Sequence, residues 1–126
     1  MSSIGALNTA VTGMQAARTQ MGVSASNVAN ARSEAATSTR PDADGFQPRR
    51  TVREAQPGGG VRAATQAVEP PSVPQPTANG EIEQRPNVSM VRESVTQIEA
   101  RAQFSANLNA VTTADEMTAS LLDMSR

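Results

Sequence analysis

The side chains of this chain that could carry out chemistry are carboxylates and arginines. The 126 residues include no His, Cys or Lys, so the usual general base, thiolate, imine-forming amine and zinc ligands are missing. The acidic side chains that lie close together in sequence fall in polar segments, without the apolar surroundings that tune a carboxyl group for proton transfer. We therefore predict that the chain is not an enzyme and has no catalytic residue, cofactor or metal site. The acidic pairs are Asp42 with Asp44, Glu81 with Glu83, and Asp115 with Glu116.

The arginines suggest a different kind of contact. Arg49, Arg50 and Arg53 form a local basic cluster, and the planar guanidinium group suits carboxylates, so salt bridges to a neighbouring subunit are one interpretation. An exposed strand face that is kept soluble by charge is the other. The remaining arginines are scattered and the formal net charge is −1, which argues against a nucleic-acid partner.

The composition is poor for a self-sufficient core. The chain has no Trp or Tyr and only two Phe, and a small domain needs large apolar side chains, disulfides or metals to offset chain entropy. We expect stability to come from contacts with other chains. The first twenty residues lack a basic region followed by an apolar run, and no segment is long enough to span a bilayer. We therefore expect no cleaved signal peptide and no direct membrane insertion.

The elements that must make these contacts are two terminal helices. A heptad-like apolar stripe predicts a helix over residues 3–30, about 40 Å long, with Ser2 or Ser3 as N-cap. Such a stripe is typical of a coiled coil or helical bundle. Its members are Ile4, Leu7, Val11, Met14, Met21, Ala25 and Val28.

Two asparagines stand near the end of this helix. Asn27 and Asn30 are three residues apart and share a helix face. Asn30 can act as a simple C-cap, because Asn tolerates the left-handed conformation. Alternatively, the amide pair fixes the register of an assembling helix, as a polar residue in a coiled-coil seam does.

The middle of the chain, residues 32–86, differs in character. All eight prolines lie in it, which excludes long helices and favours extended backbone. Two strand-like stretches, 46–54 and 61–68, flank a glycine-rich turn, so this connector can contain a β-hairpin.

A second helix is expected to start near Val88, with Asn87 as its N-cap. Its apolar residues fall on two opposite faces when stepped at about 100° per residue. Because one partner helix covers only one face, we infer neighbours on both sides. The first face holds Val88, Val91, Val95, Ile98 and Ala102, and the second holds Phe104, Leu108, Val111 and Leu122.

Both ends of the chain resemble the flagellar basal-body rod family. "TAVTGMQAARTQMGVSASNVANA" is similar to the N-terminal signature of bacterial rod and hook proteins, with Ser26 in place of the first Asn of an Asn-Asn-x-Ala-Asn element. "PNVSMVRESVTQIEARAQFSANLNAVTTADEM" is similar to the C-terminal signature, including Ala106-Asn107 after the aromatic Phe104. The length and the order of the middle segments are closest to the proximal rod proteins.

The resemblance implies a mainly α fold, in which two long terminal helices pack as an antiparallel coiled-coil-like pair. Residues 1–31 and 87–126 would form one polymerisation core, joined by the extended Pro/Gly-rich connector 32–86. It also implies export by the flagellar type III apparatus without a cleaved signal, and a torque-transmitting rod in the periplasm built with other copies and other rod proteins. The alternative is a soluble helical adaptor or export chaperone that binds one partner helix. The expected assembly interface comprises Ile4, Leu7, Val11, Met14, Met21, Asn27, Val28, Asn30, Val88, Val91, Val95, Ile98, Phe104, Asn107, Leu108, Val111 and Leu122, with Arg49, Arg50 and Arg53 as salt-bridge candidates.

Overall fold

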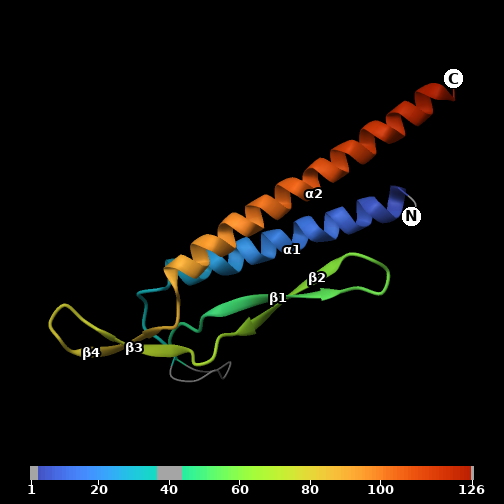
Figure 1. Ribbon diagram of the computed structural model, residues 1–126. Helices are drawn as coiled ribbons and strands as arrows, with labels where there is room; N and C mark the ends of the chain where they lie inside the picture. Colours follow the sequence, from blue (N-terminus) through green and yellow to red (C-terminus); the bar gives the residue numbers. More distant parts are fainter. Residues whose placement is uncertain (1–2, 37–43, 126) are drawn as a thin grey trace.

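The computed structural model describes residues 3–36 and 44–125, and it contains two long helices and two β-hairpins (Figure 1). The predictions of a helix at each end and of a hairpin between them are confirmed. Ser2 and Asp42 lie outside the described residues. The elements are α1 (Ser3–Ala29), β1 (Arg49–Ala55), β2 (Val61–Ala67), β3 (Ser72–Pro76), β4 (Ile82–Pro86) and α2 (Met90–Met124).

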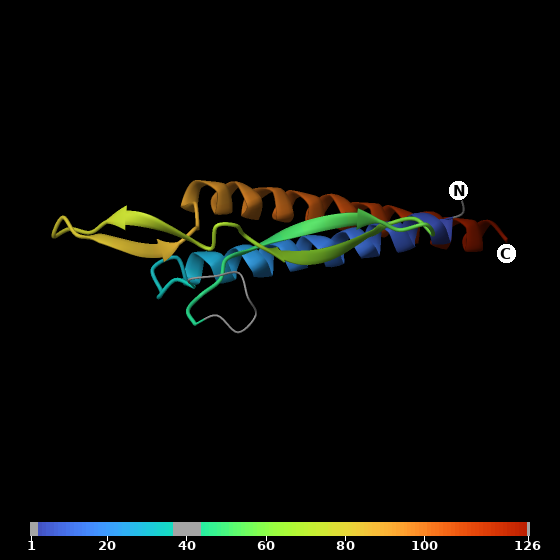
Figure 2. The same cartoon turned by 90° about the horizontal axis from the view of Figure 1, so that it is seen from below.

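The two helices lie antiparallel, so both chain termini are at the same end of an elongated molecule (Figures 1 and 2). Helix α1 lies between α2 and the β1–β2 hairpin and contacts both. The β3–β4 hairpin projects at the opposite end, and among the described elements β3 and β4 contact only each other. The pair α1–α2 is therefore the spine on which the first hairpin rests.

Small side chains hold this spine together. The buried apolar residues of the helices are alanines: Ala10, Ala16 and Ala17 on α1, and Ala100 on α2, each at most 5% exposed. A Cβ at Gly13 would lie 2.7 Å from Nδ2 of Asn107, so the helices approach closely there. This packing leaves most of the large apolar side chains outside the contact between α1 and α2.

The β1–β2 hairpin docks on α1 through its turn and both of its strands. Thr12 Oγ1 accepts a hydrogen bond from the backbone N–H of Val61 at 3.2 Å, and Arg53 donates to the side-chain oxygen of Gln20. Gly60, in the turn, has a φ of +87° and lies directly against Thr12. A side chain at this glycine would strain the backbone and collide with α1.

The β3–β4 hairpin adds to the sequence expectation, which placed extended backbone in the proline tract but did not predict its pairing. Strand β3 pairs antiparallel with β4, from Ser72 opposite Pro86 to Pro76 opposite Ile82. Pro74 and Pro76 alternate with Val73 and Gln75, so the missing N–H groups fall at positions that need not donate to the partner strand. Prolines at these positions are therefore compatible with an edge strand.

The N-cap of α2 differs from the sequence expectation. The helix begins at Met90, and Ser89 is its N-cap because Ser89 Oγ accepts from the N–H of Arg92. The expected cap, Asn87, is engaged elsewhere: its side chain donates to the Pro70 carbonyl at 2.9 Å and its backbone N–H to that of Pro71. The helix starts two residues after Val88, near the expected position, but the expected cap was wrong because Asn87 belongs to the end of the second hairpin.

Candidate assembly interface

Asn27 joins three elements of the fold. It is 3% exposed, and its Nδ2 donates to the Arg49 carbonyl at 2.7 Å and to Glu93 Oε1 at 2.8 Å. Its Oδ1 accepts from the N–H of Arg49 at 3.1 Å. The amide therefore pairs with both backbone groups of one β1 residue while it also binds a carboxylate of α2.

Asn30 has a local role. Its Nδ2 donates to the Ser26 carbonyl at 2.9 Å, and its Oδ1 accepts from the Ser33 hydroxyl at 3.1 Å. These bonds close the turn that follows α1. The two asparagines therefore have separate structural roles, one tertiary and one at the helix end.

Ser24 continues the polar contact between the helices one turn before Asn27. It is 1% exposed. Its hydroxyl donates to the Glu93 carbonyl at 3.2 Å and accepts from Gln97 Nε2 at 3.2 Å. Sequence reasoning missed Ser24, Glu93 and Gln97, because their polar side chains carry no apolar periodicity.

The face of α2 toward α1 follows a regular spacing. Its covered residues recur at alternating intervals of three and four positions, polar near the helix start and apolar further along. Phe104 and Val111 lie in this series, half-buried, and Asn107 lies opposite Gly13. The full series is Glu93, Gln97, Ala100, Phe104, Asn107, Val111 and Ala114.

The opposite face of α2 carries an apolar stripe that no described element covers. Val91, Val95 and Ile98 are 77%, 49% and 69% exposed. At about 100° per residue these three side chains point about half a turn away from the face that contacts α1. Leu108, 45% exposed, lies at one margin of that contact, and Val88 is half-buried before the helix.

The apolar stripe of α1 lies beside the helix contact. Leu7, Met14, Met21 and Val28 are half-buried. Met21 and Phe104 line a small apolar hollow of about 190 Å³ between the helices. The other three members of the stripe are exposed: Ile4 at 76%, Val11 at 41%, and Ala25.

The termini form an open end of the helix pair. Residues 115–125 are all exposed, including Leu122 at 65%. The contacts Gly13–Asn107 and Ser24–Gln97 set the register, which places the last turns of α2 beyond Ser3, the first residue of α1. Figure 1 shows the two helices diverging toward this end.

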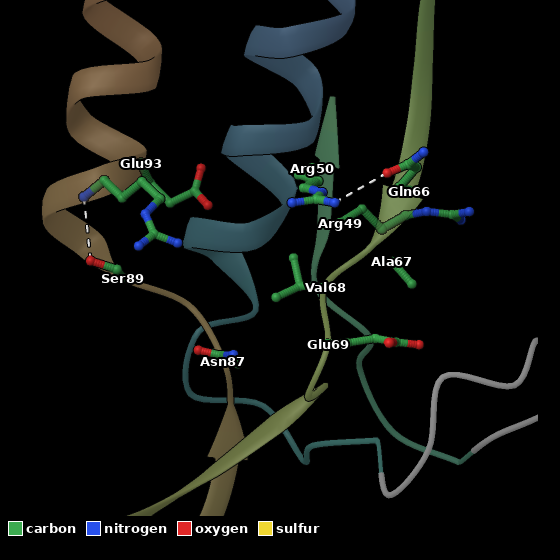
Figure 3. Close-up of a pocket in the computed structure, with 10 residues that line it drawn as sticks. Arg49, Arg50, Gln66, Ala67, Val68, Glu69, Asn87, Ser89 and Glu93 are labelled. Atoms are coloured by element: carbon green, nitrogen blue, oxygen red, sulfur yellow. Dashed lines mark hydrogen bonds between the residues drawn. The ribbon is translucent and has the colours of Figure 1, made fainter. Parts of the chain in front are cut away.

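The three candidate arginines are placed by β1. Arg50 donates to Gln66 Oε1 at 3.3 Å, Arg53 binds Gln20, and the backbone of Arg49 binds Asn27. Arg49 and Arg50 also line a cleft of about 750 Å³ beside the start of α2, together with Arg92 and Glu93 (Figure 3). The walls of this cleft carry both basic and acidic side chains, so the cleft is not a purely basic site.

The described part of the chain shows no feature of a metal centre or a membrane span. Within residues 3–36 and 44–125, no group of three acidic side chains is close enough to hold a metal ion. Neither α1 nor α2 has the length and apolar content needed to cross a bilayer, judged on the same residues. The features that stand out are the uncovered apolar surfaces of the helices.

Comparison with protein families finds matches at both ends of the chain. Residues 7–31 match the model described as flagella basal body rod protein, and residues 81–124 match that of the flagellar basal body rod FlgEFG protein C-terminal region. These ranges include most of α1 and all of α2. Comparison with curated proteins gives no significant match.

Proposed function

Because the chain belongs to the flagellar basal body rod family, we propose that it is a structural subunit of the rod that polymerises through its terminal helices. One observation carries this proposal: α2 has two opposite faces, and α1 covers only one of them. The stripe of Val91, Val95 and Ile98 is left for a neighbouring subunit. Contacts of this kind, made between different patches on each copy, extend into helical polymers when they do not close into a ring.

The proposed mechanism is mechanical. Coiled-coil-like packing of helices between subunits would form a wall that transmits torque without any catalytic group. Ordering would be coupled to assembly, because apolar area buried between chains offsets chain entropy only when neighbours are present. Arg49, Arg50 and Arg53, on an exposed edge of β1, would pair with acidic groups of adjacent subunits.

Finer features of the proposal come from the sequence resemblance. They are a position in the proximal rod, similar to FlgC, and export through the flagellar type III apparatus without a cleaved signal, followed by assembly in the periplasm. The partners would be further copies and other rod proteins. The polymerising core would be residues 1–31 and 87–126, with the connector 32–86 touching neighbours.

Single substitutions on the two sides of α2 test the proposal. Val95→Asp and Leu108→Asp each place a charge in a contact that assembly would bury, and each should block rod formation and motility while secretion of the chain continues. A buried Val or Leu contributes about 1.5–3 kcal/mol, and the loss recurs at every subunit contact. Ala110→Asp is the matched control, because Ala110 is exposed and, at about 100° per residue, lies between the two apolar faces. Motility preserved in Val95→Asp would show that the exposed stripe is not an assembly surface.

Circular dichroism of the purified chain separates the rod subunit from a helical adaptor. A rod subunit should be largely unstructured when dilute and gain helix as concentration rises. A stable dimer that melts sharply and does not polymerise would favour the adaptor.

A further inference from the structure

The two ends of the molecule carry complementary surfaces. One is the last part of α2, residues 115–124, in which Met117, Leu121 and Leu122 are 62–65% exposed. The acidic residues Asp115, Glu116 and Asp123 accompany them, and residues 102–125 contain no basic residue. The C-terminal end of a helix also carries a partial negative charge. This surface, which we term the acidic tip, is apolar and negative.

The other surface is a groove at the opposite end of the spine. It has a volume of about 770 Å³ and is walled by the end of α1, the start of α2 and the turn of the second hairpin. Its lining is mixed, with apolar side chains that include Val28, Pro76, Ala78 and Met90, and its two charged residues are Arg32 and Arg85. Arg85 already pairs with Glu83 at 2.8 Å, whereas Arg32 is exposed. We term this surface the basal groove.

The tip and the groove cannot meet within one subunit. They lie at opposite ends of α2, whose 35 residues extend about 50 Å at about 1.5 Å per residue. Figure 1 shows the C-terminus and the second hairpin at opposite ends of the molecule. We propose that the acidic tip of one subunit docks in the basal groove of a second copy of this chain, end to end. This inference rests on the proposed polymerisation and adds an axial contact to the lateral one made by Val91, Val95 and Ile98.

The chemistry of the two surfaces selects this occupant. The groove offers several apolar side chains together with positive charge and no acidic lining residue, and the tip offers leucine and methionine side chains with negative charge. A contact between unlike patches on two copies leaves one tip and one groove free, so it can repeat along a polymer when it does not close into a ring. A bare apolar helix from another source would satisfy the groove walls but leave Arg32 without a carboxylate.

Cysteine cross-linking tests the contact, and the chain has no cysteine of its own to interfere. In the full chain carrying Ala78→Cys and Leu122→Cys, oxidation of the polymer should yield a covalent ladder of dimers, trimers and higher species. Intrachain closure is excluded because a disulfide requires Cα atoms within about 7 Å. The control is Ala78→Cys with Gln56→Cys, since Gln56 is exposed in the turn of the first hairpin, and it should give no ladder.

A charge swap supplies a second readout. Adding Arg32→Glu to the cross-linking pair should lower the ladder yield at least tenfold, and further adding Asp123→Arg should restore it. A polymer that sediments normally but yields no ladder, yields the same ladder in the control, or cross-links to a different chain would overturn end-to-end docking and leave the lateral contact standing. Failure of the chain to sediment as a polymer would instead overturn the proposed function, and this inference with it.

Discussion

Replacing Asn27 by Ala should release the first hairpin from the helix pair. The substitution removes both partners of the Arg49 backbone and one donor to Glu93, at distances of 2.7, 3.1 and 2.8 Å. Neutral hydrogen bonds contribute about 0.5–1.5 kcal/mol each, and a bond to a charged group about 1.5–3 kcal/mol. Glu93 is only half-buried and can recruit water, so we take the lower part of the sum, about 3 kcal/mol.

Amide hydrogen exchange in the polymerised chain measures this loss. An undocked two-stranded hairpin is marginal in water, so amides shared between β1 and β2 should exchange about 100-fold faster, since about 1.4 kcal/mol corresponds to a factor of ten. Asn30→Ala is the matched control: it loses two exposed local bonds, one to Ser26 and one from Ser33, and should change hairpin exchange by less than about tenfold.

Asn27→Asp tests whether the N–H donor of the Asn27 side chain, and not only its shape, holds β1 in place. Aspartate can still accept from the Arg49 N–H, but it cannot donate to the carbonyl and it places a second carboxylate beside Glu93. We therefore expect it to release the hairpin at least as strongly as alanine. Hairpin exchange within threefold of the parent in both Asn27 variants would refute the idea that this amide anchors β1.

Three further substitutions test the close contacts of α1. Gly60→Ala should destabilise hairpin docking by about 1–3 kcal/mol, because Gly60 has a φ of +87° and faces Thr12. Gly58→Ala should be neutral, because a Cβ at Gly58 would meet nothing within 4 Å. Hydrogen exchange of the β2 amides compares the two variants, and equal effects would contradict the docking. Gly13→Leu should separate the helices and prevent polymerisation, as measured by sedimentation. In Gly13→Ala the new Cβ would displace the side-chain amide of Asn107, while the helix propensity improves by about 1 kcal/mol. Adding Asn107→Ala should therefore restore normal thermal stability. A large loss of thermal stability that persists in the double variant would show that the two helix backbones themselves are too close.

The sequence predicted the elements with strong periodicity and missed those set by tertiary contacts. The terminal helices and the first hairpin follow from apolar spacing and from the glycines between the strands. Ser89, and not Asn87, caps α2 because the Asn87 side chain is held by the Pro70 carbonyl 17 positions earlier in the chain. A local pattern cannot show such a partner, and the pairing of β3 with β4 was hidden for the same reason.

The candidate interface was open to prediction only in part. Periodicity identified apolar residues on both sides of α2, but it predicted that large apolar residues form the contact between the helices. The contact between α1 and α2 uses Ala10, Ala17 and Ala100, with Ser24 and Asn27 as buried polar members. Gly13 within a helix was the available signal, since a glycine that interrupts a helical pattern often marks a close approach.

This division between small buried residues and large exposed ones has a physical consequence for the proposed rod. Alanine contacts bury little apolar area, so they fix the register of α1 against α2 but contribute little hydrophobic stabilisation. The side chains with the largest hydrophobic contribution, Val91, Val95, Ile98 and Leu122, remain exposed. If neighbouring subunits cover them, most of the stabilisation becomes available only on assembly. A chain of this kind can remain unfolded until it reaches the growing structure, because the same contacts that would stabilise it also place it in the polymer.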